Sequence, residues 1–158
     1  MSDASPAGAA AAAADRSYPS RPILAASVAV FRDGRVLVAS RTRPPLDALY
    51  SLPGGLVETG ETLAEAALRE LDEEVGVRAE ILGVLRPVEI VERDAEGRVK
   101  HHFVVVPHVA RWIAGEGTIG LEAGDVRWVE ETEVAGLRAT PGLARTVGAA
   151  FRLAEGGA

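Results

Sequence analysis

The chain has 158 residues, 47% of them hydrophobic and 25% charged, which suits a single domain with a substantial core. The net charge of −6 argues against a broad nucleic-acid-binding surface, and the absence of cysteine excludes disulfides, thiolate catalysis and cysteine-based zinc sites. The sequence has no run of about 18 apolar residues, so no membrane span is expected. An acidic site that needs a cation is compatible with these properties.

The N-terminal segment mixes Ala, Ser, Pro and Gly and lacks the basic start of a secretory signal. We therefore expect a cytoplasmic protein. Residues 1–21 are interpreted as a flexible tail, 22–153 as one domain and 154–158 as a short C-terminal tail.

Strand-type runs and turn signals alternate along the domain. Apolar runs rich in β-branched residues predict strands, and the Asp-Gly and Glu-Gly sequences between them predict turns. The predicted strands are 23–31, 36–40, 79–92 as one strand or two, 99–113 and 125–130, with turns at 32–35 and 93–98 and a loop at 41–51. A C-terminal helix is predicted over 141–156, where Leu143, Val147 and Ala150 form an apolar stripe. This order predicts a mixed sheet with helices packed on it.

A second helix is predicted over residues 63–75. Thr62 and Glu65 have the spacing of a capping box, and Gly76 suits the left-handed position that ends a helix. At about 100° per residue, one face carries the apolar side chains. This predicted core face consists of Ala64, Leu68, Leu71 and Val75.

Three carboxylates of this helix break local rules. Glu70, Glu73 and Glu74 stand at spacings of three and four residues, where like charges repel, and two of them lie in the last turn, where the helix dipole disfavours anions. Such violations are typical of functional sites. A hard divalent cation such as Mg²⁺ would turn this unfavourable concentration of negative charge into a favourable one, because Mg²⁺ prefers carboxylate oxygens as ligands and commonly also binds phosphates.

Glycines precede the helix. Gly54 and Gly55 follow Pro53 and are expected to let the backbone turn tightly, which would aim a carbonyl at a metal beside the helix. Gly60 is expected to let the loop bend back into the helix start. The loop and helix together predict a platform for a metal and phosphates.

The same residues carry a resemblance. Gly55, five residues, Glu61, seven residues and then Arg69 to Val77 resemble the complete Nudix box, with Leu71 and Val77 at its two hydrophobic positions. The "LPGG" lead-in and the later segments "ARWIAGEG" and "EAGDVRWVEETEVAGL" are also similar to this family. The resemblance spans about residues 22–150 and implies the Nudix α/β/α sandwich around a central mixed β-sheet.

The resemblance implies hydrolysis of a nucleoside diphosphate linked to another group, with Mg²⁺, or alternatively Mn²⁺, neutralising charge. It implies that Glu73 and Glu74 are metal ligands, that Glu70 is a ligand or the base that takes the proton of the water, and that the Gly54 carbonyl completes the shell. Arg69 is expected to pair with a neighbouring carboxylate. Glu61 has two readings, as a link between loop and helix or as a catalytic group.

Members of the family often add a carboxylate from a later loop. Glu122 stands where MutT-like members place theirs, with Asp125 and Glu116 as rivals, and all three can alternatively be solvated loop charges. Gly55 and the loop residues Arg41 and Arg43 are candidates for contacts to substrate phosphates. Other polar and aromatic side chains have a structural reading beside the functional one. These are His101, His102 and His108 in a strand, Tyr50 as a packed ring or a stacking surface for a base, and Trp112 and Trp128 as core or sheet residues.

The segment from Glu92 to Gly117 resembles the bacterial ADP-ribose pyrophosphatase-like branch, which implies ADP-ribose as substrate and AMP and ribose 5-phosphate as products. Arg93 stands near the point where some of these enzymes carry a proline. A MutT-like (d)NTP pyrophosphohydrolase, a nucleotide sensor without turnover and a metal-stabilised structural domain are the alternatives. The branch also implies a homodimer.

Overall fold

The structure is a computed structural model that describes residues 16–41, 48–119 and 123–156. None of the helices in these ranges is long and apolar enough to cross a membrane. The strands are β1 (Ile23–Arg32), β2 (Arg35–Arg41), β3 (Tyr50–Ser51), β4 (Gly54–Leu56), β5 (Arg78–Val84), β6 (Val88–Arg93), β7 (Val99–Ala114) and β8 (Ala123–Val129). The helices are α2 (Leu63–Val75), α3 (Glu131–Val134) and α4 (Leu143–Gly156).

The eight strands form one mixed sheet, as predicted. Strand β7 pairs in parallel with β1 along one edge and antiparallel with β5 and then β6 along the other. Its 16 residues therefore connect the body of the sheet to a long β6–β7 hairpin. The predicted strand over 79–92 is two strands, because the chain leaves the sheet around Pro87, which has no N–H for the ladder.

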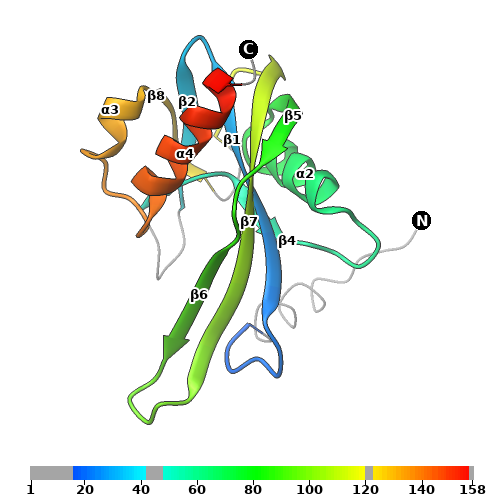
Figure 1. Ribbon diagram of the computed structural model, residues 1–158, viewed down its shortest axis with the longest axis vertical. Coiled ribbons are helices and arrows are strands. Elements are labelled where there is room, and N and C mark those ends of the chain that lie inside the picture. The colour runs from blue at the N-terminus through cyan, green and yellow to red at the C-terminus, as the bar shows by residue number, and fades with distance from the viewer. Residues whose placement is uncertain (1–15, 42–47, 120–122, 157–158) are drawn as a thin grey trace.

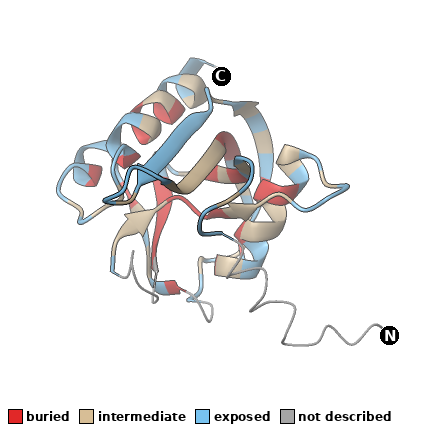
Figure 2. Ribbon diagram, turned by 90° about the horizontal axis from the view of Figure 1, so that it is seen from below, coloured by how far each residue is buried: buried red, intermediate tan, exposed pale blue. Residues whose placement is uncertain are grey.

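Helices cover both faces of the sheet (Figure 1), with α2 on one side and α3 and α4 on the other. Alternate residues of β1 face the two layers, so Val28 packs in the cluster with α2 and Ala29 in the cluster with α4. Figure 2 shows the buried residues concentrated in the middle of the molecule. The predicted α/β/α sandwich is confirmed.

The predicted bounds of α2 are confirmed. Thr62 Oγ1 accepts the Glu65 N–H, the Glu65 carboxylate accepts the Thr62 N–H, and Gly76 closes the helix at φ 64°. The predicted core face is partly wrong, because Ala64 and Leu68 are only half-buried. The helix buries Ala66, Ala67, Leu71 and Val75. Strand β4 lies beside α2 as well as β1, and this turns the buried sector toward β4.

Three short elements were missing from the sequence-based expectation. Residues 50–51 pair with β2 inside the segment interpreted as a loop, and residues 54–56 pair with β1 although two of them are glycine. Strands of two or three residues are too short to show the alternation of apolar and polar residues that predicts a strand, and glycine is depleted from strands. Helix α3 has four residues and is too short for a helical period.

The end of the predicted N-terminal tail lies against the β6–β7 hairpin. The Tyr18 N–H donates to the Lys100 carbonyl at 2.8 Å, and the Tyr18 hydroxyl donates to Asp94 at 3.1 Å. The Arg98 guanidinium lies 5.0 Å from the centre of the Tyr18 ring. Residues 16–22 are thus attached to the hairpin, whereas residues 1–15 lie outside the described part of the chain.

Candidate active site

Arg69 links helix α2 to the loop before it. Its Nε and Nη2 atoms donate to the two carboxylate oxygens of Glu61, both at 2.7 Å, and Nη2 also donates to the Leu56 carbonyl at 3.1 Å. The Glu61 side chain is only 15% exposed. Hydrogen bonds from Arg69 are the main reason that the pKa of Glu61 falls from 4.5 to about 2. Arg69 therefore pairs with a neighbouring carboxylate, and Glu61 connects loop and helix, the structural one of its two readings.

Two further carboxylates converge on the other terminal nitrogen of the same guanidinium. Nη1 of Arg69 lies 2.9 Å from a Glu70 oxygen and 3.3 Å from a Glu73 oxygen. Two acidic side chains from different helix positions thus already share one centre of positive charge, and hard oxygen donors of this kind fit Mg²⁺ or Mn²⁺. Within the described ranges, no three Asp, Glu or His side chains are close enough together to hold a metal ion. Metal ligation by Glu70, Glu73 and Glu74 therefore stays a prediction.

Glu70 also lies directly on Gly55. A Cβ atom at position 55 would stand 2.5 Å from the Glu70 carboxyl carbon, so only glycine leaves room for this carboxylate. Gly54 meets backbone instead, since a Cβ there would be 2.5 Å from the Ala26 carbonyl oxygen on β1. The predicted tight turn at these glycines is wrong. They form a strand, and what they permit is close approach to β1 on one side and to α2 on the other.

Two other glycines behave as predicted. Gly60 has a φ of 93° where the loop bends toward the start of α2, and Gly76 occupies the left-handed position at its end. Between them, Glu70 and Glu74 stand four residues apart and project from neighbouring positions of the helix.

Of the later-loop carboxylates, Glu122 lies outside the described residues, as does Arg43. Asp125 accepts hydrogen bonds from the hydroxyl of Tyr50, from Nε of Arg127 and from the Val126 N–H. These bonds lower the pKa of Asp125, while burial and the negative charge of Asp125 raise the pKa of Tyr50. Asp125 on β8 is the cross-strand partner of Ser40 on β2. Val38 lies two residues before Ser40 on β2, so it faces the same side of the sheet, and it packs in the hydrophobic cluster with α4. Asp125 is therefore on the face of the sheet away from α2.

Glu116 takes part in a contact group that sequence reasoning missed. It accepts a hydrogen bond from Arg32 at 3.0 Å, and the Arg32 guanidinium lies 4.0 Å from the centre of the Trp112 ring. The indole N–H of Trp112 donates to the Gly115 carbonyl, and that of Trp128 donates to the Glu116 carbonyl. The Thr118 N–H donates to Val75 at the end of α2. The two tryptophans therefore hold the 115–118 loop beside the C-terminus of the helix.

The remaining candidates have structural contacts. His108 is 3% exposed, and its Nδ1 atom lies within hydrogen-bond distance of two carbonyls, those of Ser27 and Val106, so Nδ1 carries a proton. His101 pairs with Glu92 at 2.8 Å on the hairpin. Tyr50 packs against the α4 cluster, which is the packing reading of that side chain. The backbone of Arg41 ends β2, and its side chain is outside the described part of the chain.

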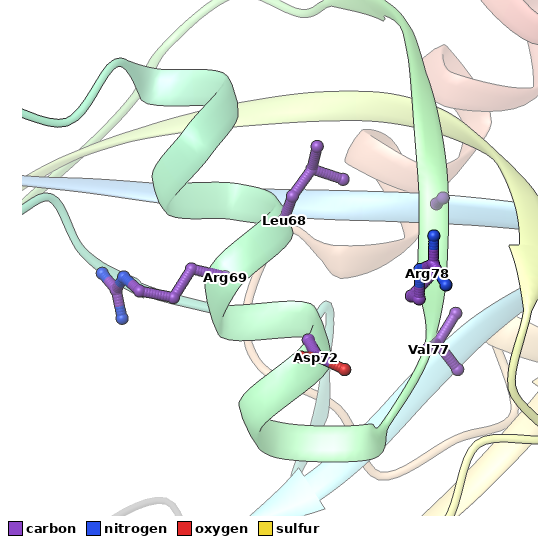
Figure 3. A pocket seen from close by; sticks show the side chains of 6 residues that line it. Leu68, Arg69, Asp72, Val77 and Arg78 are labelled. Atoms are coloured by element: carbon purple, nitrogen blue, oxygen red, sulfur yellow. The ribbon is translucent and has the colours of Figure 1, made fainter.

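A cavity of about 300 Å³ lies between α2 and β5 (Figure 3). It is lined by Leu68, Arg69, Asp72, Val77, Arg78 and Ala79. Leu68 and Asp72 are each two positions before Glu70 and Glu74, which at about 100° per residue puts them on the opposite flank of the helix. The cavity shares Arg69 with the carboxylate cluster, but Glu61, Glu70 and Glu73 are not among its lining residues.

Comparisons with known proteins identify relatives of both the sequence and the fold. The model of the NUDIX domain matches residues 21–148. An ADP-ribose pyrophosphatase of Methanocaldococcus jannaschii is 32% identical over 123 residues, covering 78% of this chain and 67% of that protein. A putative 8-oxo-dGTP diphosphatase 2 of Mycobacterium tuberculosis is 49% identical over 57 residues, covering 35% of this chain and 40% of that protein. The chain thus spans less than half the length of the mycobacterial relative.

The fold has solved counterparts. The crystal structure of a MutT NUDIX hydrolase from Burkholderia pseudomallei matches with a TM-score of 0.70 at 26% identity, covering 81% of this chain and 97% of that chain. Since the domain model covers most of the sequence and the box residues occupy the loop–helix unit described above, the chain belongs to the Nudix hydrolase family.

Proposed function

We propose that this protein is a Mg²⁺-dependent pyrophosphohydrolase that cleaves ADP-ribose to AMP and ribose 5-phosphate. The observation that carries the proposed chemistry is the convergence of Glu70 and Glu73 on one positively charged nitrogen of Arg69. Beside it, the Glu70 carboxylate lies against Gly55 of β4, where a Cβ atom would collide with it. Held by these carboxylates, a divalent metal would polarise the phosphoryl oxygens and activate water.

The protein residues then have distinct roles. Glu70, Glu73 and Glu74 would hold the metal, or Glu70 would instead accept the proton of the water. The Gly54 carbonyl, on the strand beside the helix, would complete the shell of the metal. Arg69 acts through Glu61 as a positioning residue, because its guanidinium group donates two short hydrogen bonds to the Glu61 carboxylate and so attaches the helix to the loop. The Arg41 and Arg43 side chains and Glu122 remain candidates for contacts to substrate or metal.

The choice of ADP-ribose is supported by a relative whose alignment covers 78% of this chain. The relative from Methanocaldococcus jannaschii is named an ADP-ribose pyrophosphatase, and its alignment includes most of the domain. The alignment with the putative 8-oxo-dGTP diphosphatase is shorter but closer in identity, and it supports a MutT-like (d)NTP pyrophosphohydrolase as the second candidate.

A substrate panel separates the two candidates. The purified protein is incubated with Mg²⁺ and ADP-ribose, NADH, nucleotide sugars, dinucleoside polyphosphates, dGTP or oxidised dGTP, and the products are identified by chromatography. AMP and ribose 5-phosphate from ADP-ribose, with little cleavage of triphosphates, is the expected result. A nucleoside monophosphate and pyrophosphate from a triphosphate would move the protein to the second candidate. Saturable nucleotide binding without turnover would identify a sensor.

The role of the third box carboxylate is tested by Glu74→Gln, which keeps the size of the side chain and removes its charge. We expect kcat to fall at least about a hundredfold, on the scale of losing a key electrostatic group, with the fold retained. Asp72→Asn is the matched control, because it makes the same change at an exposed position of the same helix. Equal activities of the two variants with unchanged metal dependence would contradict the assignment.

A further inference from the structure

The loop of residues 115–118, which follows β7, lies directly on the end of helix α2. The Thr118 N–H donates to the Val75 carbonyl at 2.9 Å, one of the carbonyls that a helix leaves without a partner in its own last turn. A Cβ atom at Gly115 would collide with the Gly76 carbonyl oxygen, so the two backbones are in close contact. The position of this loop therefore affects the last turn of α2, which carries two of the box carboxylates.

The loop is not held in this position by its own conformation. Gly115 and Gly117 have φ angles of 93° and 80°, a region in which glycine is the least restricted residue. A segment with two such glycines has many alternative conformations, and ordering it costs conformational entropy. Contacts from outside the loop are therefore needed to select one conformation.

A layer of three side chains supplies these contacts: Arg32 at the end of β1, Trp112 on β7 and Trp128 on β8. Both tryptophans pack against the hydrophobic cluster under α2. The Arg32 guanidinium lies 4.0 Å from the centre of the Trp112 ring and 6.0 Å from that of Trp128, and a cation is attracted to such rings. Only 29% of the Arg32 side chain is exposed, so most of it is shielded from water.

Each member of this layer donates a hydrogen bond to the loop. The Trp112 indole N–H donates to the Gly115 carbonyl at 2.6 Å. The Trp128 indole N–H donates to the Glu116 carbonyl at 3.2 Å, and Nη1 of Arg32 donates to the Glu116 carboxylate at 3.0 Å. The Glu116 side chain is 78% exposed, so the ion pair by itself contributes little to stability. Its effect is geometric, because the three bonds reach consecutive residues and fix the direction of the loop.

We propose that Arg32 is a positioning residue for the metal site, acting through the 115–118 loop on the last turn of α2. The inference rests on the proposed function, in which Glu73 and Glu74 of that turn hold the metal. Their negative charges are disfavoured at the C-terminal end of a helix, and each lies three or four residues from Glu70. Without support from the loop this turn loosens, the carboxylates spread, and the metal is bound more weakly.

The first test measures metal binding without turnover. The full chain is titrated with Mn²⁺ alone, and free Mn²⁺ is determined by electron paramagnetic resonance. Arg32→Ala should bind Mn²⁺ roughly tenfold more weakly than the unaltered protein, on the scale of losing a group that orients metal ligands. Arg35→Ala is the matched control and should bind Mn²⁺ like the unaltered protein. Arg35 lies on the other side of the same turn, and its ion pair with Glu130 is exposed to solvent.

A second variant tests the route through the loop. Trp128→Phe keeps an aromatic ring beside Arg32 and removes the N–H that donates to the Glu116 carbonyl. It should also weaken Mn²⁺ binding. In both variants the Thr118 amide should exchange its hydrogen faster, because its bond to the Val75 carbonyl opens more often. Circular dichroism shows whether each variant retains its fold.

The outcomes separate this inference from the proposed function. Unchanged Mn²⁺ affinity in both variants would overturn the inference, and so would weaker binding with unchanged exchange at Thr118. If the unaltered protein binds Mn²⁺ but hydrolyses no nucleotide, the proposed function fails, whereas the comparison of Mn²⁺ affinities still decides the role of Arg32. Absence of Mn²⁺ binding by the unaltered protein would overturn both.

Discussion

At the scale of single residues, Arg69 makes several of the hydrogen bonds that connect the parts of the site. One guanidinium bonds both oxygens of Glu61 and also contacts Glu70 and Glu73. Its negative surroundings raise the pKa of Arg69, chiefly through the hydrogen bonds to Glu61. A planar fork is needed for such contacts, and a lysine could not make them.

The pairing of Glu61 with Arg69 predicts a pH dependence of stability. The folded-state pKa of Glu61 is about 2 against an ordinary value of 4.5, so its stabilising effect is fully present above that ordinary value and is lost as the pH falls toward 2. Glu61→Gln should lower the free energy of unfolding at neutral pH, and its deficit relative to the unaltered protein should shrink as the pH falls through this window. Urea unfolding at a series of pH values measures this difference.

Glu58→Gln serves as the control for this series. Glu58 also approaches Arg69, but at 4.0 Å and with a side chain that is 70% exposed, so its removal should have little effect. Parallel pH curves for the unaltered protein and Glu61→Gln would show that this ion pair does not contribute to folding.

At the scale of elements, strand β4 positions the site although it has only three residues. Its two glycines have different neighbours, backbone of β1 for Gly54 and the flexible end of the Glu70 side chain for Gly55. A strand made of glycine has little propensity of its own. It forms because β1 supplies the ladder and α2 closes over it.

The two glycines predict opposite consequences for substitution by alanine. Gly54→Ala must shift the β1 backbone and should destabilise the fold by about 1–3 kcal/mol, the usual range for overpacking. Gly55→Ala displaces only the Glu70 carboxylate, so stability should change little while kcat falls, on the order of a hundredfold for a displacement of about 1 Å. Thermal unfolding and steady-state kinetics of both variants test this contrast. Each variant is the control for the other, and identical profiles would contradict it.

At the scale of the whole molecule, the sheet joins two hydrophobic clusters. Leu71 and Val28 belong to the cluster under α2, and Val147 and Ala29 belong to the cluster under α4. Because both clusters use side chains of the same strands, neither can lose its packing while the other keeps its full set of contacts.

This sharing predicts one cooperative unfolding transition. Leu71→Ala, at a fully buried position, should cost about 2–5 kcal/mol and lower the single denaturation midpoint without splitting it. Leu82→Ala is the matched control, since Leu82 is 44% exposed and its truncation should cost much less. Two separate transitions in the calorimetric or urea profile of either protein would show that the layers unfold independently.

Sequence reasoning was most accurate where local physics is decisive. The α2 bounds follow from a capping box and a left-handed glycine, both of which act within a few residues. The long strands follow from apolar runs, and the turn at Asp33 and Gly34 from two residues that tolerate positive φ. The family follows from the box, because its residues have fixed spacing along one loop and one helix.

The tertiary structure decided what depends on contacts between distant segments. Only the fold shows that Gly54 and Gly55 form a strand wedged between β1 and α2, since nothing within that segment favours a strand. The direction of Asp125 away from α2, and the tryptophans that hold the 115–118 loop, likewise result from strand register rather than from spacing. The type of chemistry was therefore determined by the sequence itself, because its residues lie close together in the chain. The surroundings of the site required the fold, because contacts between segments far apart in the chain create them.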